Sequence, residues 1–74
     1  MGTPKFYTKL KETREKRGLS QESLAAIVGV SKETIRKIEN GLSIPNVFLA
    51  ISIAKVLKIS LEILFQKLNE KEKN

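Results

Sequence analysis

The chain has 74 residues, which is room for one compact domain with a small hydrophobic core. It contains no cysteine and no histidine, which excludes disulfide bonds, thiol catalysis, zinc fingers and imidazole acid–base catalysis. Lysine and arginine number 14 against 8 for aspartate and glutamate. The resulting net charge of +6 favours a polyanionic partner: nucleic acid, an acidic membrane surface or an acidic protein.

Apolar residues recur at helical rather than alternating spacing, so we expect a mostly helical domain. The first helix is predicted from residue 7 or 8 to residue 17, ending at Gly18 and preceded by an N-terminal arm over 1–6. Residues 5–8 could also pair as a short strand with residues 65–68.

Serine marks the start of three predicted helices. Each of these serines can cap a helix with its hydroxyl, and two apolar residues bracket it as a hydrophobic staple. The second helix is therefore predicted over 20–28, ending at Gly29, the third over 32–40 and the fifth over 60–68. The serines are Ser20, Ser31 and Ser60, bracketed by Leu19 and Leu24, Val30 and Ile35, and Ile59 and Leu64.

The fourth helix follows Pro45, with Asn46 as its cap, and is predicted to run to about residue 57. Residues 69–74 form a charged tail that cannot bury apolar surface. No run approaches the roughly 18 apolar residues that a membrane-spanning helix needs, and there is no signal-peptide segment. We therefore expect a cytoplasmic protein that does not bind membranes.

The third helix is amphipathic. Two isoleucines fall on one side of it and would face the core, while the opposite side is charged or amide-bearing. Such a face is often merely solvated, but a helix of this kind also fits a DNA major groove, where its first residues can reach base edges. The inward residues are Ile35 and Ile38, and the outward ones are Glu33, Lys37 and Asn40, with Arg36 to one side and Lys32 at the helix start.

The link between the second and third helices is short. Gly29 can take the left-handed conformation that ends one helix, Val30 can anchor the turn, and Ala25 leaves space for the helices to approach. We therefore expect two helices at a steep angle, with the second one projecting.

A longer pattern runs through the same region: Ser20-Gln21-x-x-Leu24-Ala25-x-x-x-Gly29-Val30-Ser31-x-x-Thr34-Ile35-x-x-Ile38-Glu39-x-Gly41, then Pro45, Leu49, Ile53-Ala54, Leu57 and Leu61-Glu62-x-Leu64-Phe65. This pattern resembles the lambda-repressor-like (Cro/Xre-type) helix-turn-helix family over about residues 10–65. The resemblance implies an all-α fold: a compact five-helix DNA-binding domain over 7–68, with the helix-turn-helix at 20–40 and the short terminal β pairing as an option. It also implies a prokaryotic or phage-like, nucleoid-associated protein that binds double-stranded DNA and needs no cofactor.

The resemblance assigns roles by position. It implies that Lys32, Glu33 and Lys37 face the bases, with Arg36 flanking them, and that Gln21 contacts a phosphate and supports the start of the recognition helix. Lysine and arginine can donate to guanine O6 and N7, and a glutamate can accept from cytosine N4. Glu33 could instead pair with Lys37 four residues on. The other phosphate contacts expected are Ser31, Thr34, Asn40, Ser43 and Asn46.

Glu39 stands at the end of the third helix. The family pattern pairs this position with an arginine of the first helix, and Arg14 occupies that arginine's place. The resemblance therefore implies a structural ion pair between Arg14 and Glu39.

The fifth helix is apolar on more than its core side. Leu61, Leu64, Phe65 and Leu68 form one stripe, and Ile63 lies opposite. We expect Leu61, Ile63, Phe65 and Leu68 to form a homodimer interface, because a twofold pair reads a palindrome with half-sites about 34 Å apart. The alternative is that they complete the core of a single chain. Leu42, Ile44 and Phe48 also stand where the family usually has polar residues.

The leading hypothesis is a sequence-specific transcriptional regulator, most simply a repressor that binds a palindromic operator as a dimer. The alternative is a protein-interaction module, such as an antitoxin, that acts through its apolar fifth helix. An enzyme is the weakest hypothesis, since the sequence has no metal-ligand cluster and no nucleophile–base set. No small-molecule ligand is evident.

Overall fold

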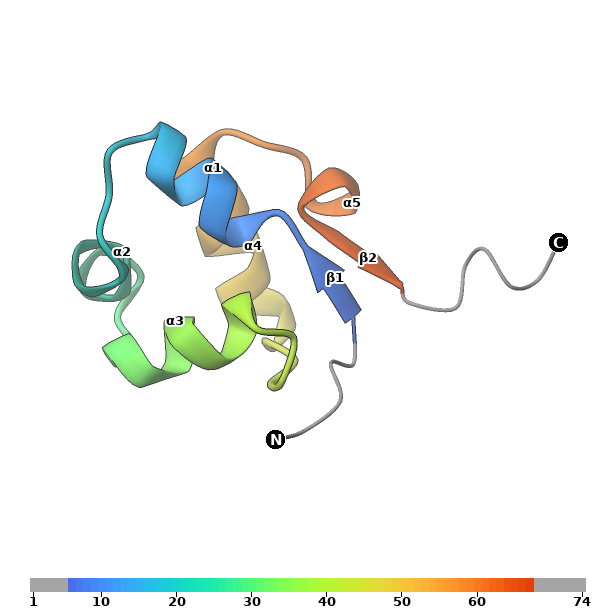
Figure 1. Ribbon diagram of the computed structural model, residues 1–74, viewed down its shortest axis with the longest axis horizontal. Coiled ribbons are helices and arrows are strands. Elements are labelled where there is room, and N and C mark those ends of the chain that lie inside the picture. The colour runs from blue at the N-terminus through green and yellow to red at the C-terminus, as the bar shows by residue number, and fades with distance from the viewer. Residues whose placement is uncertain (1–5, 68–74) are drawn as a thin grey trace, which may run out of the picture.

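The computed structural model describes residues 6–67, which form five helices and one two-stranded antiparallel sheet (Figure 1). This is the five-helix architecture predicted from the sequence. The predictions for residues 1–5, for Leu68 and for the tail at 69–74 lie outside the described residues. In chain order the elements are β1 (Phe6–Thr8), α1 (Leu10–Lys16), α2 (Gln21–Val28), α3 (Lys32–Glu39), α4 (Val47–Leu57), α5 (Leu61–Leu64) and β2 (Phe65–Lys67).

Polar side chains cap four helices at the predicted starts. Ser20, Ser31 and Ser60 each accept a hydrogen bond from the backbone N–H three residues on. Asn46 caps α4 in the same way, with its Oδ1 2.8 Å from the nitrogen of Leu49. All four capping residues have extended backbone, as the N-cap position requires. The predicted cap positions are confirmed.

The hydrophobic core lies where all five helices meet. Fully burying an aliphatic side chain stabilises a protein by about 1.5–3 kcal/mol, so the isoleucines of α3 hold that helix firmly on the domain. Within residues 6–67, no helix has the length and hydropathy to cross a bilayer. The fully buried large side chains are Leu10, Leu24, Ile35, Ile38, Ile53, Leu57 and Leu64.

The terminal β pairing is present and delays the start of α1. In the antiparallel register Tyr7 lies opposite Gln66. Helix α1 begins at Leu10, not at residue 7 or 8, because residues 7 and 8 belong to β1. The Oγ1 of Thr8 then accepts the hydrogen bond of the Leu10 N–H at 3.0 Å.

The same pairing ends α5 early. The predicted helix over 60–68 stops at Leu64, because Phe65 turns to an extended conformation with φ −121° and ψ 126° and continues into β2. The Leu64 carbonyl accepts a hydrogen bond from the Lys9 N–H at 3.0 Å. The rings of Phe6 and Phe65 meet edge to face with their centroids 5.7 Å apart. Helix α5 is therefore a single turn leading into the strand.

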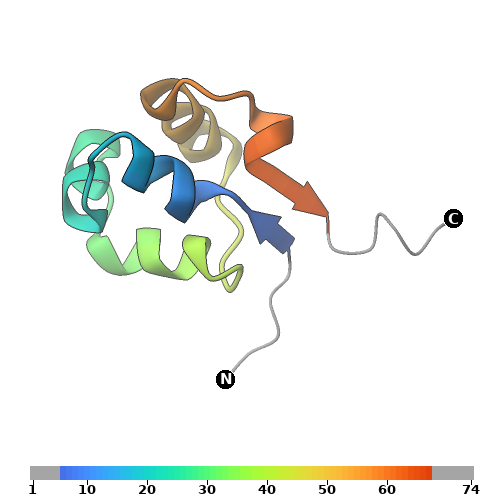
Figure 2. The ribbon, with the colours of Figure 1, turned by 45° about the horizontal axis from the view of Figure 1, so that its top comes forward.

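Helix α2 ends at Gly29, whose φ of 80° lies in the left-handed region. A Cβ added there would meet nothing within 4 Å, so this position favours glycine for its backbone conformation and not for a close approach. The N–H groups of Gly29 and Val30 both donate to the Ala25 carbonyl, at 2.8 and 2.9 Å. After this turn α3 lies along one edge of the molecule, and the link between α4 and α5 lies at the opposite edge (Figures 1 and 2).

Candidate nucleic-acid interface

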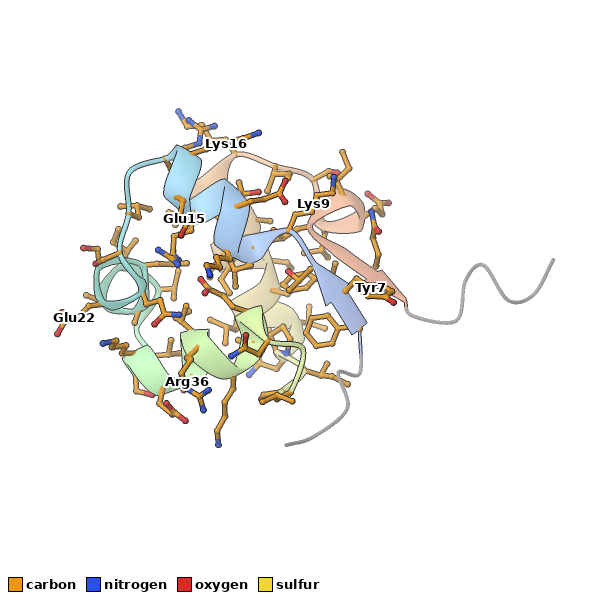
Figure 3. The ribbon with its side chains drawn as sticks, in the orientation of Figure 1. Tyr7, Lys9, Glu15, Lys16, Glu22 and Arg36 are labelled. Carbon is orange, nitrogen blue, oxygen red and sulfur yellow. The ribbon has the colours of Figure 1, made fainter. Side chains whose placement is uncertain are left out.

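Helix α3 buries one side and exposes the other. Its two inward isoleucines have no exposed surface, whereas Lys32, Glu33 and Lys37 are exposed. The Arg36 side chain is 44% exposed and lies on the outer side of the helix (Figure 3). All four residues predicted to face the bases are therefore on the accessible surface.

Two of these residues form an ion pair. Arg36 donates from Nε to Glu33 Oε1 at 2.8 Å and from Nη2 to Oε2 at 2.6 Å. The partner of Glu33 is thus Arg36, three residues on, and not Lys37, the alternative considered from the sequence. The hydrogen bonds from Arg36 lower the pKa of the Glu33 carboxyl, and the carboxylate in turn raises the pKa of Arg36. Glu33 is therefore ionised near neutral pH, with both oxygens accepting from Arg36.

Glu39 joins three helices near the end of α3. Arg14 of α1 donates from Nε to Oε2 at 2.5 Å and from Nη2 to Oε1 at 3.3 Å. The two side chains are only 8% and 3% exposed. The remaining guanidinium contact is from Nη1 to the Leu19 carbonyl at 2.7 Å. The ion pair implied by the resemblance is present and hydrogen-bonded on several sides, which orients α3 on the domain.

Gln21 completes the same network from the start of α2. Its Nε2 donates to Glu39 Oε1 at 2.9 Å. The side chain therefore supports the last turn of α3 and not the first turn, where the resemblance had placed it. One amide N–H is used in this way, so a phosphate would have to accept from the second N–H or from the backbone N–H.

The other predicted phosphate contacts lie at the start of α3 and across the loop to α4. Ser31 and Thr34 share a hydrogen bond between their hydroxyl oxygens at 2.9 Å. Asn40 is exposed at the C-terminal end of α3, Ser43 is half-buried in the loop, and Asn46 caps α4. Because the cap uses the Oδ1 of Asn46, its Nδ2 is the side-chain group left to donate.

The residues predicted to form the dimer interface line two different hollows of the surface. Leu61 and Phe65 line an open apolar groove of about 490 Å³ beside the loop that precedes α4. Ile63 lines a different hollow, between α1 and the end of α4. Leu68 lies outside the described residues.

The groove includes residues that the predicted interface did not. Ile44 and Pro45 of the loop and Phe6 of β1 line it together with Leu61. Ile44 is 68% exposed and Phe48, two residues into α4, is 82% exposed. The apolar character of Ile44 at a position that is usually polar was the sequence signal for this groove.

Known proteins resemble this chain in fold and in sequence. The helix-turn-helix family model HTH_3 matches residues 10–64. The chain is 40% identical over 57 residues to the uncharacterized HTH-type transcriptional regulator YgzD of Bacillus subtilis (strain 168), covering 77% of this chain and 86% of that protein. Among solved structures it is similar to the DNA-binding domain of the P22 c2 repressor, with a TM-score of 0.67 and 28% identity over 72% of this chain and 70% of that one. It is also similar to SinR, a master regulator for biofilm formation, in complex with DNA, with a TM-score of 0.65 and 30% identity over 72% of this chain and 86% of that one.

Proposed function

Because the chain belongs to the HTH_3 family of Cro/Xre-type helix-turn-helix proteins, we propose that it is a sequence-specific transcriptional regulator that reads double-stranded DNA with α3. The observation that carries the proposal is the division of α3 into a buried apolar side and an accessible side bearing Lys32, Arg36 and Lys37. A helix anchored in this way fits a major groove, where basic side chains donate to guanine O6 and N7. The similarity to SinR, whose structure contains DNA, supports this use of the fold.

The base-reading residues divide into free cations and one paired unit. Lys32 and Lys37 are exposed lysines that can reach guanine directly. The Glu33–Arg36 pair would act together: the remaining guanidinium N–H groups donate to guanine, and the carboxylate accepts from a neighbouring cytosine N4. Glu33 also repels phosphate, so the pair penalises binding in which α3 lies on the DNA backbone.

Phosphate contacts would hold α3 in register. We assign them to the starts of α2, α3 and α4, where the first N–H groups of a helix have no partner within the helix and attract anions, and to the end of α3 with the loop that follows it. The Ser31 and Asn46 oxygens already accept from their own helices, so these side chains would contact phosphate as donors. The residues of this set are Gln21, Ser31, Thr34, Asn40, Ser43 and Asn46.

A homodimer would contact enough base pairs to recognise a specific operator. One recognition helix reads only a few base pairs, whereas two related by a twofold axis read a palindrome with half-sites about 34 Å apart. The apolar groove lined by Leu61, Phe65 and Ile44 is the surface we propose for this contact. The similarity to the P22 c2 repressor domain supports a repressor role at such an operator.

Selection of bound duplexes from random DNA, with sizing of the selected complex, tests the function. We expect a palindromic consensus bound by two chains with a dissociation constant of roughly 10⁻⁸ to 10⁻¹¹ M. Binding should weaken with salt with a slope of about −0.9 per neutralised phosphate. Lys37→Glu should abolish selection, whereas Lys55→Glu, an equal charge change on α4, should not. A chain that binds no duplex even at low salt would instead be a protein-interaction module of the antitoxin type.

A further inference from the structure

A second charged surface lies away from α3. A hollow of about 420 Å³ opens between α1, the end of α4 and α5. Its rim carries four cations, Lys9, Lys16, Arg17 and Lys58, and one carboxylate, Glu12. In Figure 3 Lys9 and Lys16 lie on the side of the molecule opposite to Arg36. This surface, which we call the basic hollow, would therefore stay accessible while α3 occupies a DNA groove.

The rim of the basic hollow carries more positive than negative charge. The ion pairs within residues 6–67 are Arg14–Glu39 and Arg36–Glu33, so none of the four rim cations takes part in one. Arg17 is nevertheless held in place, because its Nε donates to the Leu57 carbonyl at 3.1 Å. A cluster of like charges around a concavity focuses an attractive field for an anionic partner. The rim is thus positioned to bind carboxylates or phosphates.

Lys58 occupies a backbone position that favours glycine. It caps the C-terminus of α4 with φ 57° and ψ 47°, and it is the one non-glycine residue with a positive φ in the part of the chain that the structure describes. The left-handed conformation costs a residue with a Cβ roughly 1–2 kcal/mol. The strained backbone at Lys58 supports a role for its cationic side chain on the rim.

The floor of the basic hollow is apolar. Ile63 is 50% exposed there, Ile59 is half-buried and Leu57 is buried beneath them. A DNA backbone would pair with the cations of the rim but leave the apolar floor exposed to water. An acidic protein segment with apolar side chains on the same face would pair with the cations and cover the floor.

We propose that the basic hollow docks an acidic amphipathic segment of a partner protein, with its carboxylates on Lys16, Arg17 and Lys58 and an apolar side chain on Ile63. This contact does not depend on DNA binding by α3. It would give the regulator a protein-binding surface on the side that faces away from the DNA.

The proposal can be tested by NMR titration of the full isotope-labelled chain with a short helical peptide that presents glutamates and leucines on one face. We expect shifts at the amides of Ile59 and Ile63 and not on α3. The combined change Lys16→Glu and Lys58→Glu should weaken binding at least about tenfold. The matched reversal on α3, Lys32→Glu and Lys37→Glu, should leave peptide binding unchanged.

Further measurements separate the alternatives. The Lys16 and Lys58 variant must keep the wild-type amide spectrum in α2 and α3, which shows that it folds, and Ile63→Ser alone should also weaken binding. A control peptide with glutamine in place of glutamate should bind more weakly. Equal binding of both peptides, shifts confined to α3, or no shift at the basic hollow up to about 1 mM peptide would overturn the proposal. So would a non-operator duplex that shifts the basic hollow as strongly as α3, which would make the hollow a second DNA site.

Discussion

Arg14 and Glu39 are buried together between α1 and α3, with their side chains 8% and 3% exposed and Nε 2.5 Å from Oε2. Gln21 donates to the same carboxylate from the start of α2. One carboxylate thus ties the last turn of α3 to α1 and α2. The angle at which α3 projects is set by this contact as well as by the isoleucines in the core.

Glu39→Ala should lower the free energy of unfolding by about 3–5 kcal/mol, because it leaves the Arg14 charge buried without its partner. Urea denaturation of the two proteins measures the difference. Glu15→Ala, at an exposed position of α1, is the control and should change stability by less than about 0.5 kcal/mol. If the two substitutions cost the same, the ion pair does not hold α3 in place.

The carboxyl of Glu33 should titrate at a lower pH in the wild-type chain than in Arg36→Ala, because the hydrogen bonds from Arg36 lower its pKa. The pair's contribution to stability is complete above the unfolded-state pKa and is lost as the pH falls through the depressed folded-state pKa. That contribution is small, since both side chains are exposed. Carboxyl NMR titration gives the midpoints directly. Lys55→Ala should leave the Glu33 midpoint unchanged, and an identical midpoint in Arg36→Ala would contradict the pairing.

Lys58→Gly should stabilise the fold by about 0.5 kcal/mol, because the steric cost of the left-handed conformation that glycine removes exceeds the extra backbone entropy that glycine gives the unfolded chain. Thermal or urea unfolding can resolve this gain. Lys58→Ala removes the charge but keeps the Cβ, so it should give no such gain. Equal stability of the two variants would mean that this conformation is not strained.

Lys37→Ala should cost about 1–3 kcal/mol of operator affinity and relax the preference at one base position, because a base contact carries sequence information. Ser43→Ala, in the loop between α3 and α4, should instead weaken all sequences alike, as loss of a phosphate contact does. Affinities for the operator and for single-base variants distinguish the two patterns. A uniform loss for Lys37→Ala would reassign that residue to the DNA backbone.

Leu61→Glu should convert the proposed dimer to a monomer, because it places a charge in the apolar groove. Ile63→Glu puts the same charge into the separate hollow and should leave the dimer intact. Sedimentation at micromolar concentration, with and without operator DNA, measures both. If Ile63→Glu dissociates the dimer and Leu61→Glu does not, the interface lies on the other side of α5.

The helix starts and the helix-turn-helix could be predicted from the sequence because their signals are local. A serine hydroxyl caps the helix that begins beside it, and Gly29 supplies a backbone conformation that needs no distant partner. The inward direction of Ile35 and Ile38 follows from helical periodicity alone. These features depend only on residues that are close together in the sequence.

The remaining differences between prediction and structure have two causes. Some depend on contacts between residues that are distant in the sequence, and others on helix positions that the sequence pattern treats as equivalent. The start of α1 and the end of α5 are set by β1 pairing with β2, and the spacing of Leu61, Leu64 and Phe65 is equally compatible with a longer helix. Positions three and four residues after Glu33 lie on the same helix face, so only the side-chain geometry selects Arg36 over Lys37. Helical periodicity already placed Ile63 opposite Leu61, but the contribution of Ile44 and Pro45 to the groove beside Leu61 depends on the path of the loop before α4, which periodicity does not describe.

The antiparallel pairing of β1 with β2 closes a loop that contains every helix of the described chain. Loop-closure entropy makes such a contact costly compared with the three-residue turn between α2 and α3. The strands are therefore expected to pair late in folding and to separate while the helices stay folded. Amide hydrogen exchange should be faster in the two strands than in the helices, as expected of a separate unit of low stability. The groove beside Phe6 and Phe65 would then open locally while α3 stays folded.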